Sequence, residues 1–265
     1  MVHAKRLHFH PVLISAVGND ELGERALRNI AALHIETTML RRSTKWATGT
    51  ASVAIDDQGH PTFRILRPAA YDDLHLSSSD LHALRRLQPS WLYYGTLCCA
   101  AGEGKSTLLE LFRELPEALR FYDVNLRPGS YTPELVRELI AAANVVKLNE
   151  FEAKAVSGLL GLPADLESFC RAGAARLGWK AVCVTLGERG CALFDGNEFV
   201  TAAAKKVTVA DTVGAGDAFA AAFLYGLTEG WIATKIAQFA NCVGGLIASR
   251  AGALPEWSAI EASTI

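Results

Sequence analysis

From residue 91 onward, short apolar runs alternate with longer segments in which apolar residues recur every three or four positions. The short runs predict buried strands at 91–94, 120–124, 145–148 and 181–185. The longer segments predict helices at 106–114, 133–143, 150–156 and 164–177. Residues 214–229 and 232–249 predict two more helices, whose faces are rich in Ala and Gly and suit close packing on a sheet. Such an alternation is typical of an α/β fold with a mostly parallel sheet.

The first 90 residues follow this rhythm less closely. A buried strand is expected at 11–17, and a helix follows it with Asp20 in the N-cap position. The runs 48–55 and 62–66 are rich in β-forming residues and flank a turn-rich connection, so they predict a β-hairpin. We therefore expect a single domain over residues 1–265, with 44–68 as a small inserted β unit.

Composition narrows the function classes. Half of the 265 residues are apolar and a fifth are charged, which favours a folded domain with a large core. The net charge of −2 gives no reason to expect nucleic acid or a membrane surface as a partner. Six cysteines lack zinc-type spacing and predict buried free thiols in a cytoplasmic protein. His3, His8 and His10 are interpreted as part of a solvated N-terminal segment and not as a metal site.

Residues 211–219, DTVGAGDAF, carry the strongest chemical signal. Gly214 and Gly216 allow the backbone of Gly214, Ala215 and Gly216 to turn its N–H groups toward one point, and the following helix adds its unpaired N–H groups there. This arrangement suits a phosphoryl group in transfer. Asp217 beside an anion site makes sense as the base that takes a proton from an attacking hydroxyl. The alternative is that Asp217 merely caps the helix.

The same nine residues resemble the signature of the PfkB/ribokinase family of sugar and nucleoside kinases. In that family the second Asp is the catalytic base, and the Gly-Ala-Gly backbone forms the anion hole. The resemblance assigns these roles to Asp217 and to residues 214–216. It also implies a ribokinase-like three-layer α/β/α sandwich, with a mostly parallel central sheet and a small β-hairpin lid.

Three further segments resemble family motifs in the family's order. Residues 147–152, KLNEFE, resemble the K-x-N-x-x-E segment, in which Asn149 and Glu152 would help to place Mg²⁺ and phosphate. Residues 184–190, VTLGERG, resemble the nucleotide segment, and residues 123–128, DVNLRP, resemble the D-x-N-x-R stretch of fructokinases and 2-keto-3-deoxygluconate kinases. The resemblance assigns ATP binding to Thr185, Gly187, Gly190 and Asn241, and sugar binding to Asn125 and Arg127.

The resemblance implies ATP and Mg²⁺ as cofactors, with a monovalent cation such as K⁺ near the turn at 250–253. It further implies a small sugar substrate, and a homodimer formed through the hairpin. Ordinary structural roles explain Asn241, as a core polar residue, and the 250–253 turn, as a helix end, equally well. Arg127 is equally well explained as a partner of Asp123 or Glu150.

Two features argue against a simple assignment. The segment 102–106, GEGKS, invites a P-loop interpretation, but Cys99 stands where the pattern requires glycine, so Lys105 is expected to begin a helix. The family's first strand-helix unit is expected to be absent, which would leave a sheet edge unpaired. A nucleotide-binding protein without sugar kinase activity therefore remains the alternative to the kinase.

Overall fold

The computed structural model describes residues 1–55 and 61–264, and these fall into two compact units. Unit 1 comprises Met1–Pro11, Trp91–Thr96 and Leu119–Ile265. Unit 2 comprises Val12–Ser90 and Leu97–Ala118. Every residue that the sequence assigns to the candidate site belongs to unit 1.

The centre of unit 1 is a six-stranded sheet with the order β10-β9-β8-β7-β6-β5. The neighbours from β5 to β8 pair in parallel, and β9 and β10 are added antiparallel. The mostly parallel sheet is thus confirmed, and β5 lies at one end of its strand order. The strands are β5 (Trp91–Gly95), β6 (Leu119–Asp123), β7 (Val145–Asn149), β8 (Ala181–Thr185), β9 (Cys191–Phe194) and β10 (Phe199–Ala202).

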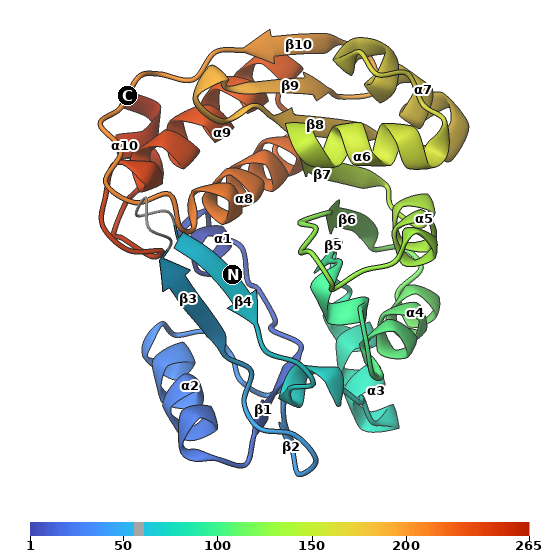
Figure 1. Ribbon diagram of the computed structural model, residues 1–265, viewed down its shortest axis with the longest axis vertical. Helices are drawn as coiled ribbons and strands as arrows, with labels where there is room; N and C mark the ends of the chain where they lie inside the picture. Colours follow the sequence, from blue (N-terminus) through green and yellow to red (C-terminus); the bar gives the residue numbers. More distant parts are fainter. Residues whose placement is uncertain (56–60, 265) are drawn as a thin grey trace. The chain divides into compact units, whose positions relative to one another are not determined.

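Helices cover both faces of this sheet (Figure 1). Alternate strand residues, among them Phe121, Val145, Cys183 and Leu193, share one apolar core with two long C-terminal helices, α8 (Ala215–Thr228) and α9 (Ala233–Ala248). The other face is covered by α5 (Pro133–Ala141), α6 (Glu150–Leu160) and α7 (Leu166–Leu177). This two-sided burial explains why the strands read as nearly continuous apolar runs. Unit 1 is therefore a three-layer α/β/α arrangement.

The N-terminal segment is folded, contrary to the expectation of a solvated tail. Helix α1 (Val2–Arg6) contacts α8, and Leu7 is 1% exposed within the α8–α9 core. His3 is buried, and its Nδ1 accepts a hydrogen bond of 3.0 Å from the indole N–H of Trp257. Trp257 precedes the last helix, α10 (Ala259–Thr264). The expectation was wrong because several apolar residues of this segment, Ala4, Leu7 and Phe9, pack on the α8–α9 core.

Unit 2 contains two small sheets and three helices in its described part. Strand β1 (Ser15–Gly18) pairs in parallel with β2 (Leu40–Ser43), and β3 (Ala51–Ile55) pairs antiparallel with β4 (Pro61–Ile65). The predicted hairpin is therefore confirmed, although residues 56–60 of its connection lie outside the described residues. Its roles as a lid and as a dimer contact remain predictions. The helices are α2 (Glu21–Ala32), α3 (Ser78–Leu87) and α4 (Gly104–Glu114), with single 3₁₀ turns at Ala70–Asp72 and Leu97–Cys99.

Local signals explain two helix starts in this unit. The Asp20 carboxylate accepts a hydrogen bond of 2.8 Å from the Gly23 N–H, as expected of an N-cap. Lys105 lies in the first turn of α4, as predicted, and not in a phosphate-binding loop. Gly104 is required for packing, because a Cβ atom there would lie 1.8 Å from the carbonyl oxygen of Cys98.

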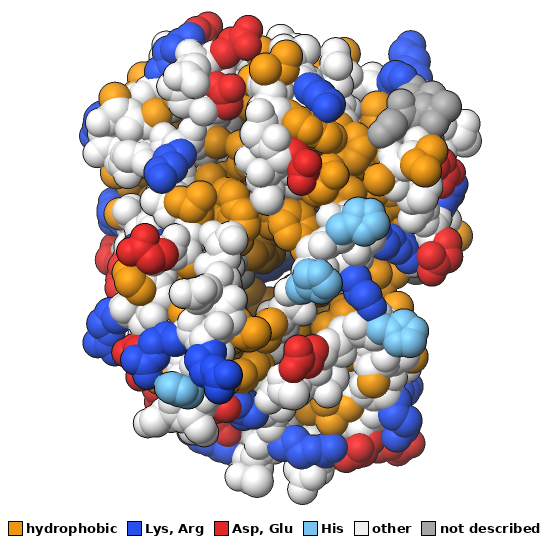
Figure 2. All heavy atoms as spheres, turned by 180° about the vertical axis from the view of Figure 1, so that it is seen from behind, with side chains coloured by type: hydrophobic (Ala, Val, Ile, Leu, Met, Phe, Trp, Pro, Cys, Tyr) orange, Lys and Arg blue, Asp and Glu red, His pale blue; other side chains and the backbone are white. Residues whose placement is uncertain are grey.

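Acidic and basic side chains are interspersed on the face shown in Figure 2, in keeping with the small net charge. Within residues 1–55 and 61–264, no helix combines the length and the hydropathy needed to cross a bilayer.

Candidate active site

The turn before α8 is built around Gly214. Its φ of 84° lies in the left-handed region, and a Cβ atom there would lie 2.3 Å from the carbonyl oxygen of Ala253. Asp211, the first acid of the motif, accepts hydrogen bonds from the N–H of Val213 (2.9 Å) and of Gly252 (3.2 Å). The glycine-rich turn is thereby joined to the turn that follows α9.

The N-terminus of α8 is open to a ligand. Gly214 is the N-cap and offers no side chain to cap the helix. The N–H groups of Ala215 and Ala218 donate to Thr212 and Gly214, whereas those of Gly216 and Asp217 have no acceptor within the described part of the chain. Asp217 lies in the first helical turn with its side chain exposed, and it is not the cap. The turn therefore presents two N–H groups beside an exposed carboxylate, and its role as an anion hole remains a prediction.

Three predicted side chains follow adjacent parallel strands at their carboxyl ends, the usual position of ligands in such sheets. Asn149 and Thr185 end β7 and β8 and are direct register partners. Asn125 follows β6 closely and adopts a φ of 39°, which is uncommon for a residue with a side chain and occurs often at functional sites. The structure thus brings Asn125, Asn149 and Thr185 to one edge of the sheet.

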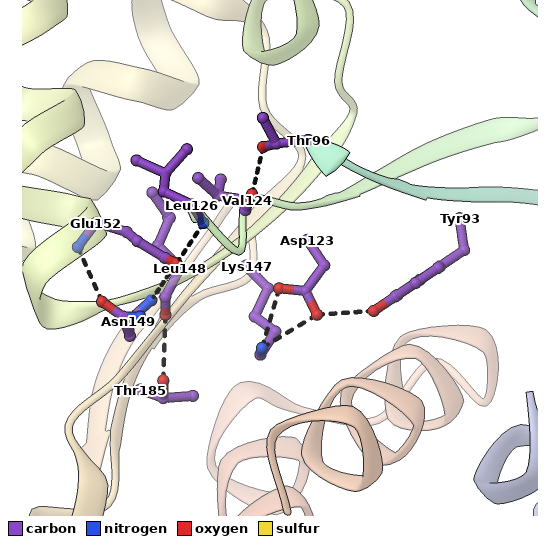
Figure 3. A network of polar contacts seen from close by, with 10 residues as sticks. All are labelled: Tyr93, Thr96, Asp123, Val124, Leu126, Lys147, Leu148, Asn149, Glu152 and Thr185. Atoms are coloured by element: carbon purple, nitrogen blue, oxygen red, sulfur yellow. Dashed lines mark hydrogen bonds and ion pairs between the residues drawn. The ribbon is translucent and has the colours of Figure 1, made fainter. Parts of the chain in front are cut away.

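Asn149 and Glu152 form a capping box at the start of α6. The Asn149 side chain accepts the N–H of Glu152, and one oxygen of Glu152 accepts the N–H of Asn149, each at 2.9 Å. The other carboxylate oxygen accepts the N–H of Leu126, also at 2.9 Å, and so holds the loop after β6 (Figure 3). Burial raises the pKa of Glu152, an effect that the two N–H groups and the nearby Lys147 charge oppose. Glu152 is 7% exposed, so its first role in the fold is to fix this corner.

A charge network that the sequence did not predict lies beside the turn at Gly216, with Lys147 and Asp123 buried and Tyr93 half-exposed. The Lys147 ammonium lies 3.0 and 3.1 Å from the two carboxylate oxygens of Asp123, and the Tyr93 hydroxyl donates to the same carboxylate at 2.7 Å (Figure 3). Burial lowers the pKa of Lys147, but Asp123, Glu152 and Asp217 outweigh it, so the net shift of this pKa is upward. A lysine inside an otherwise apolar strand was the signal in the sequence.

The residues assigned to the nucleotide have mixed surroundings. Gly187 has a φ of 62° and open space around it, as close approach of a ligand would require. Gly190 serves the β8–β9 turn, because a Cβ atom there would lie 2.0 Å from the carbonyl oxygen of Ala202. The Asn241 amide donates to that same carbonyl oxygen at 2.9 Å, as a core polar residue would. Nucleotide binding by Gly190 and Asn241 remains a prediction.

Arg127 is exposed on the loop after β6. The two carboxylates proposed as its structural partners are engaged elsewhere, since Asp123 pairs with Lys147 and Glu150 pairs with Arg189 at 2.5 Å. This arrangement favours a ligand-binding role for Arg127 over the structural one.

Known proteins of one family resemble this chain. A family model described as pfkB family carbohydrate kinase matches residues 1–259. A fructokinase of Escherichia coli is 27% identical over 249 residues, which cover 91% of this chain and 78% of the fructokinase.

Two solved structures show the same fold. A fructokinase from Xylella fastidiosa with bound ATP aligns with a TM-score of 0.86 at 20% identity, over 99% of this chain and 87% of that one. A fructokinase from Vibrio cholerae O395, solved with fructose, ADP and calcium, aligns with a TM-score of 0.77 at 25% identity, over 96% and 84% of the two chains. These likenesses confirm the expected fold.

Proposed function

Since the chain belongs to the pfkB family of carbohydrate kinases, which are phosphotransferases, we propose that it transfers the γ-phosphoryl group of ATP to a primary hydroxyl of a small sugar. The observation that carries this proposal is the open N-terminus of α8. Two N–H groups that find no acceptor in the described part of the chain lie beside an exposed carboxylate, and in-line phosphoryl transfer needs both parts.

Asp217 acts as the general base in this proposal. It takes the proton of the sugar hydroxyl as the hydroxyl oxygen bonds to the γ-phosphorus, and the bond from that phosphorus to the β–γ bridging oxygen breaks to leave ADP. The N–H groups of Gly216 and Asp217 stabilise the charge that develops on the transferring group. Gly214 and Ala215 hold the turn that aims them.

Residues at the sheet edge would hold the nucleotide and its metal. Thr185, Gly187, Gly190 and Asn241 are assigned to ATP. Both oxygens of Glu152 already accept backbone N–H groups, so Asn149 and Glu152 fit Mg²⁺ through bridging water molecules and not as a direct cage. When bound, Mg²⁺ would neutralise phosphate charge. A monovalent cation such as K⁺ beside the 250–253 turn is also part of the proposal.

The substrate class follows from the loop after β6 and from the relatives. The DVNLRP stretch at 123–128 and the similarity to a fructokinase favour fructose or a 2-keto-3-deoxygluconate-like sugar. Asn125 and Arg127 are the residues that would bind it, because both are exposed on this loop at the sheet edge.

The test is ADP release by the purified chain with Mg²⁺-ATP and fructose, 2-keto-3-deoxygluconate, ribose or adenosine. Asp217→Asn should retain ATP binding and lose about 10²–10⁴-fold in turnover, the usual contribution of a general base. Asp165→Asn, at the exposed cap of α7, is the matched control, because Asn caps a helix as well as Asp does. Turnover of Asp217→Asn within about tenfold of the parent would exclude Asp217 as the base.

The same assay addresses the alternative function. ATP binding without ADP release from any of the four acceptors would favour a nucleotide-binding protein without sugar kinase activity. Release that depends on one acceptor and disappears in Asp217→Asn would establish the kinase and its substrate class.

A further inference from the structure

Lys147 occupies a position where the fold alone would favour an apolar residue. It lies in β7 on the face that α8 covers, two residues after Val145 of the α8–α9 core, and its register partner Cys183 belongs to the same core. Lys147 is 9% exposed and Asp123 is 4% exposed. Replacing a buried ion pair with apolar residues of similar volume is often neutral or stabilising. Stability therefore does not explain why a charge stands here.

The ammonium group of Lys147 lies next to Gly216, in the turn that begins α8. A Cβ atom built on Gly216 would have the Lys147 Nζ 3.9 Å away, and no other atom lies closer among those it would meet. Gly216 is one of the two residues of this turn whose N–H has no acceptor within residues 1–55 and 61–264. A positive charge thus lies beside the backbone turn that would receive a phosphoryl group.

The charge is held in place from the other side. Asp123 contacts the ammonium through both oxygens, and Tyr93 on β5 fixes one of these oxygens. Strand register places Asp123 directly opposite Lys147. Three strands therefore contribute to the Lys147–Asp123–Tyr93 network, in which Lys147 and Asp123 are buried and Tyr93 is half-exposed.

The electrostatic problem at this site is an excess of negative charge. Asp123, Glu152 and Asp217 all lie close enough to influence the Lys147 ammonium, and a phosphoryl group would add further negative charge beside Asp217. Because Lys147, Asp123 and Glu152 are buried, charges near them are screened less than charges at the open surface. A buried cation that faces the turn offsets it without occupying the space that the ligand needs.

We infer that Lys147 is a positioning residue for phosphoryl transfer, which places a fixed positive charge beside the Gly216 N–H so that the γ-phosphoryl group is accepted beside Asp217. The inference rests on the proposed function, and it assigns to Asp123 and Tyr93 the task of holding Lys147.

The test uses the full chain with three variants. Lys147→Met removes the charge, Lys147→Arg keeps it, and the double variant Lys147→Met/Asp123→Asn removes both charges, so that no unpaired carboxylate is left buried. The double variant is decisive. If Lys147 only balances Asp123, removing both restores function; if it serves the phosphoryl group, the defect persists. Thermal unfolding by circular dichroism checks that each variant is folded.

We expect kcat/KM for ATP to fall about ten- to hundredfold in Lys147→Met and in the double variant, less than the ~10²–10³-fold loss on removing a direct oxyanion donor. KM for the sugar should change by less than about threefold, since that contact is not altered. Lys147→Arg should recover most of the lost activity. A double variant within about twofold of the parent would overturn the inference.

A binding measurement tests the same inference without turnover. By calorimetry with Mg²⁺ present, affinity for the non-hydrolysable ATP analogue AMP-PNP should fall about tenfold in the double variant, while affinity for ADP stays within about threefold. If the ratio of AMP-PNP affinity to ADP affinity is the same in the double variant as in the parent, the proposed role of Lys147 is refuted. If the parent shows no sugar-dependent turnover, the proposed function fails in the assay, but this comparison still decides the role of Lys147.

Discussion

Replacement of Glu152 offers a sharp test of how the site corner is built. In Glu152→Ala, the N–H groups of Leu126 and Asn149 both lose their acceptor, and each unsatisfied group costs about 1–3 kcal/mol. Removing a carboxylate whose pKa is raised by burial relieves part of that loss. The net expectation is a decrease of about 2–4 kcal/mol in the free energy of unfolding.

The assay is thermal and urea unfolding, in EDTA and without nucleotide, so that no metal contributes. A loss of about 2–4 kcal/mol corresponds to a Tm lower by roughly 4–16 °C for a domain of this size. The matched control is Glu150→Ala, two residues earlier on the same helix, where a half-exposed pair with Arg189 should contribute less than about 1 kcal/mol.

The result also separates the corner-holding role from metal binding. If Glu152→Ala unfolds within about 1 kcal/mol of the parent in EDTA, the hydrogen bonds to Leu126 and Asn149 are not what holds this corner, and the reasoning is refuted. A variant that is destabilised without metal, and that also needs more Mg²⁺ for half-maximal turnover, would show that Glu152 does both.

Two further predictions concern the Gly214 turn and His3. Gly214→Ala should lower the free energy of unfolding in urea by about 2 kcal/mol or more, because it adds a clash with Ala253 to the strain of a positive φ. The control is Gly230→Ala, at a position with a φ of 64° and open space, which should lower it by only about 1 kcal/mol. Equal losses in the two variants would contradict the clash. Burial and the nearby Arg6 charge lower the pKa of His3 below its ordinary 6.5, so the unfolded chain binds the proton more readily and stability should fall as pH falls below 6.5. Between pH 7.5 and pH 5, the free energy of unfolding should fall less in His3→Leu than in the parent. His10→Gln, on the exposed surface, should behave like the parent. Parallel curves for all three proteins would exclude His3 as the cause of the pH dependence.

The parts of the fold that the sequence predicted are those recorded by local pattern. Runs such as 145–148 and 181–185 are mostly apolar because strands of a parallel sheet are buried on both faces. These runs therefore marked the strands, and the segments between them marked the helices. The turn at Gly214 was predictable because it needs a backbone conformation with positive φ, and glycine adopts this conformation without strain. The capping box of Asn149 and Glu152 has the three-residue spacing typical of such boxes, so the start of α6 was also predictable from the sequence.

What the sequence did not predict depends on long-range register and packing. Lys147 and Asp123 lie 24 residues apart, and only the pairing of β6 with β7 places them opposite each other. Helix α1 was missed because a five-residue helix has little periodicity of its own, and it forms on the surface of α8. Strands β9 and β10 were also not predicted, because a strand of four residues is too short to show a clear apolar pattern.

These two classes of feature meet at the N-terminus of α8. The local sequence specifies the glycine turn and its N–H groups. Without Lys147, these N–H groups would have to bind an anion beside Asp217 and near two buried carboxylates, Asp123 and Glu152. A turn of this kind would work poorly if its surroundings were otherwise only negative. The Lys147 charge, set by strand register, makes the locally encoded turn compatible with its acidic surroundings. The motif and the sheet are thus parts of one electrostatic arrangement, and a variant that keeps the motif but removes the charge beside it is expected to lose activity.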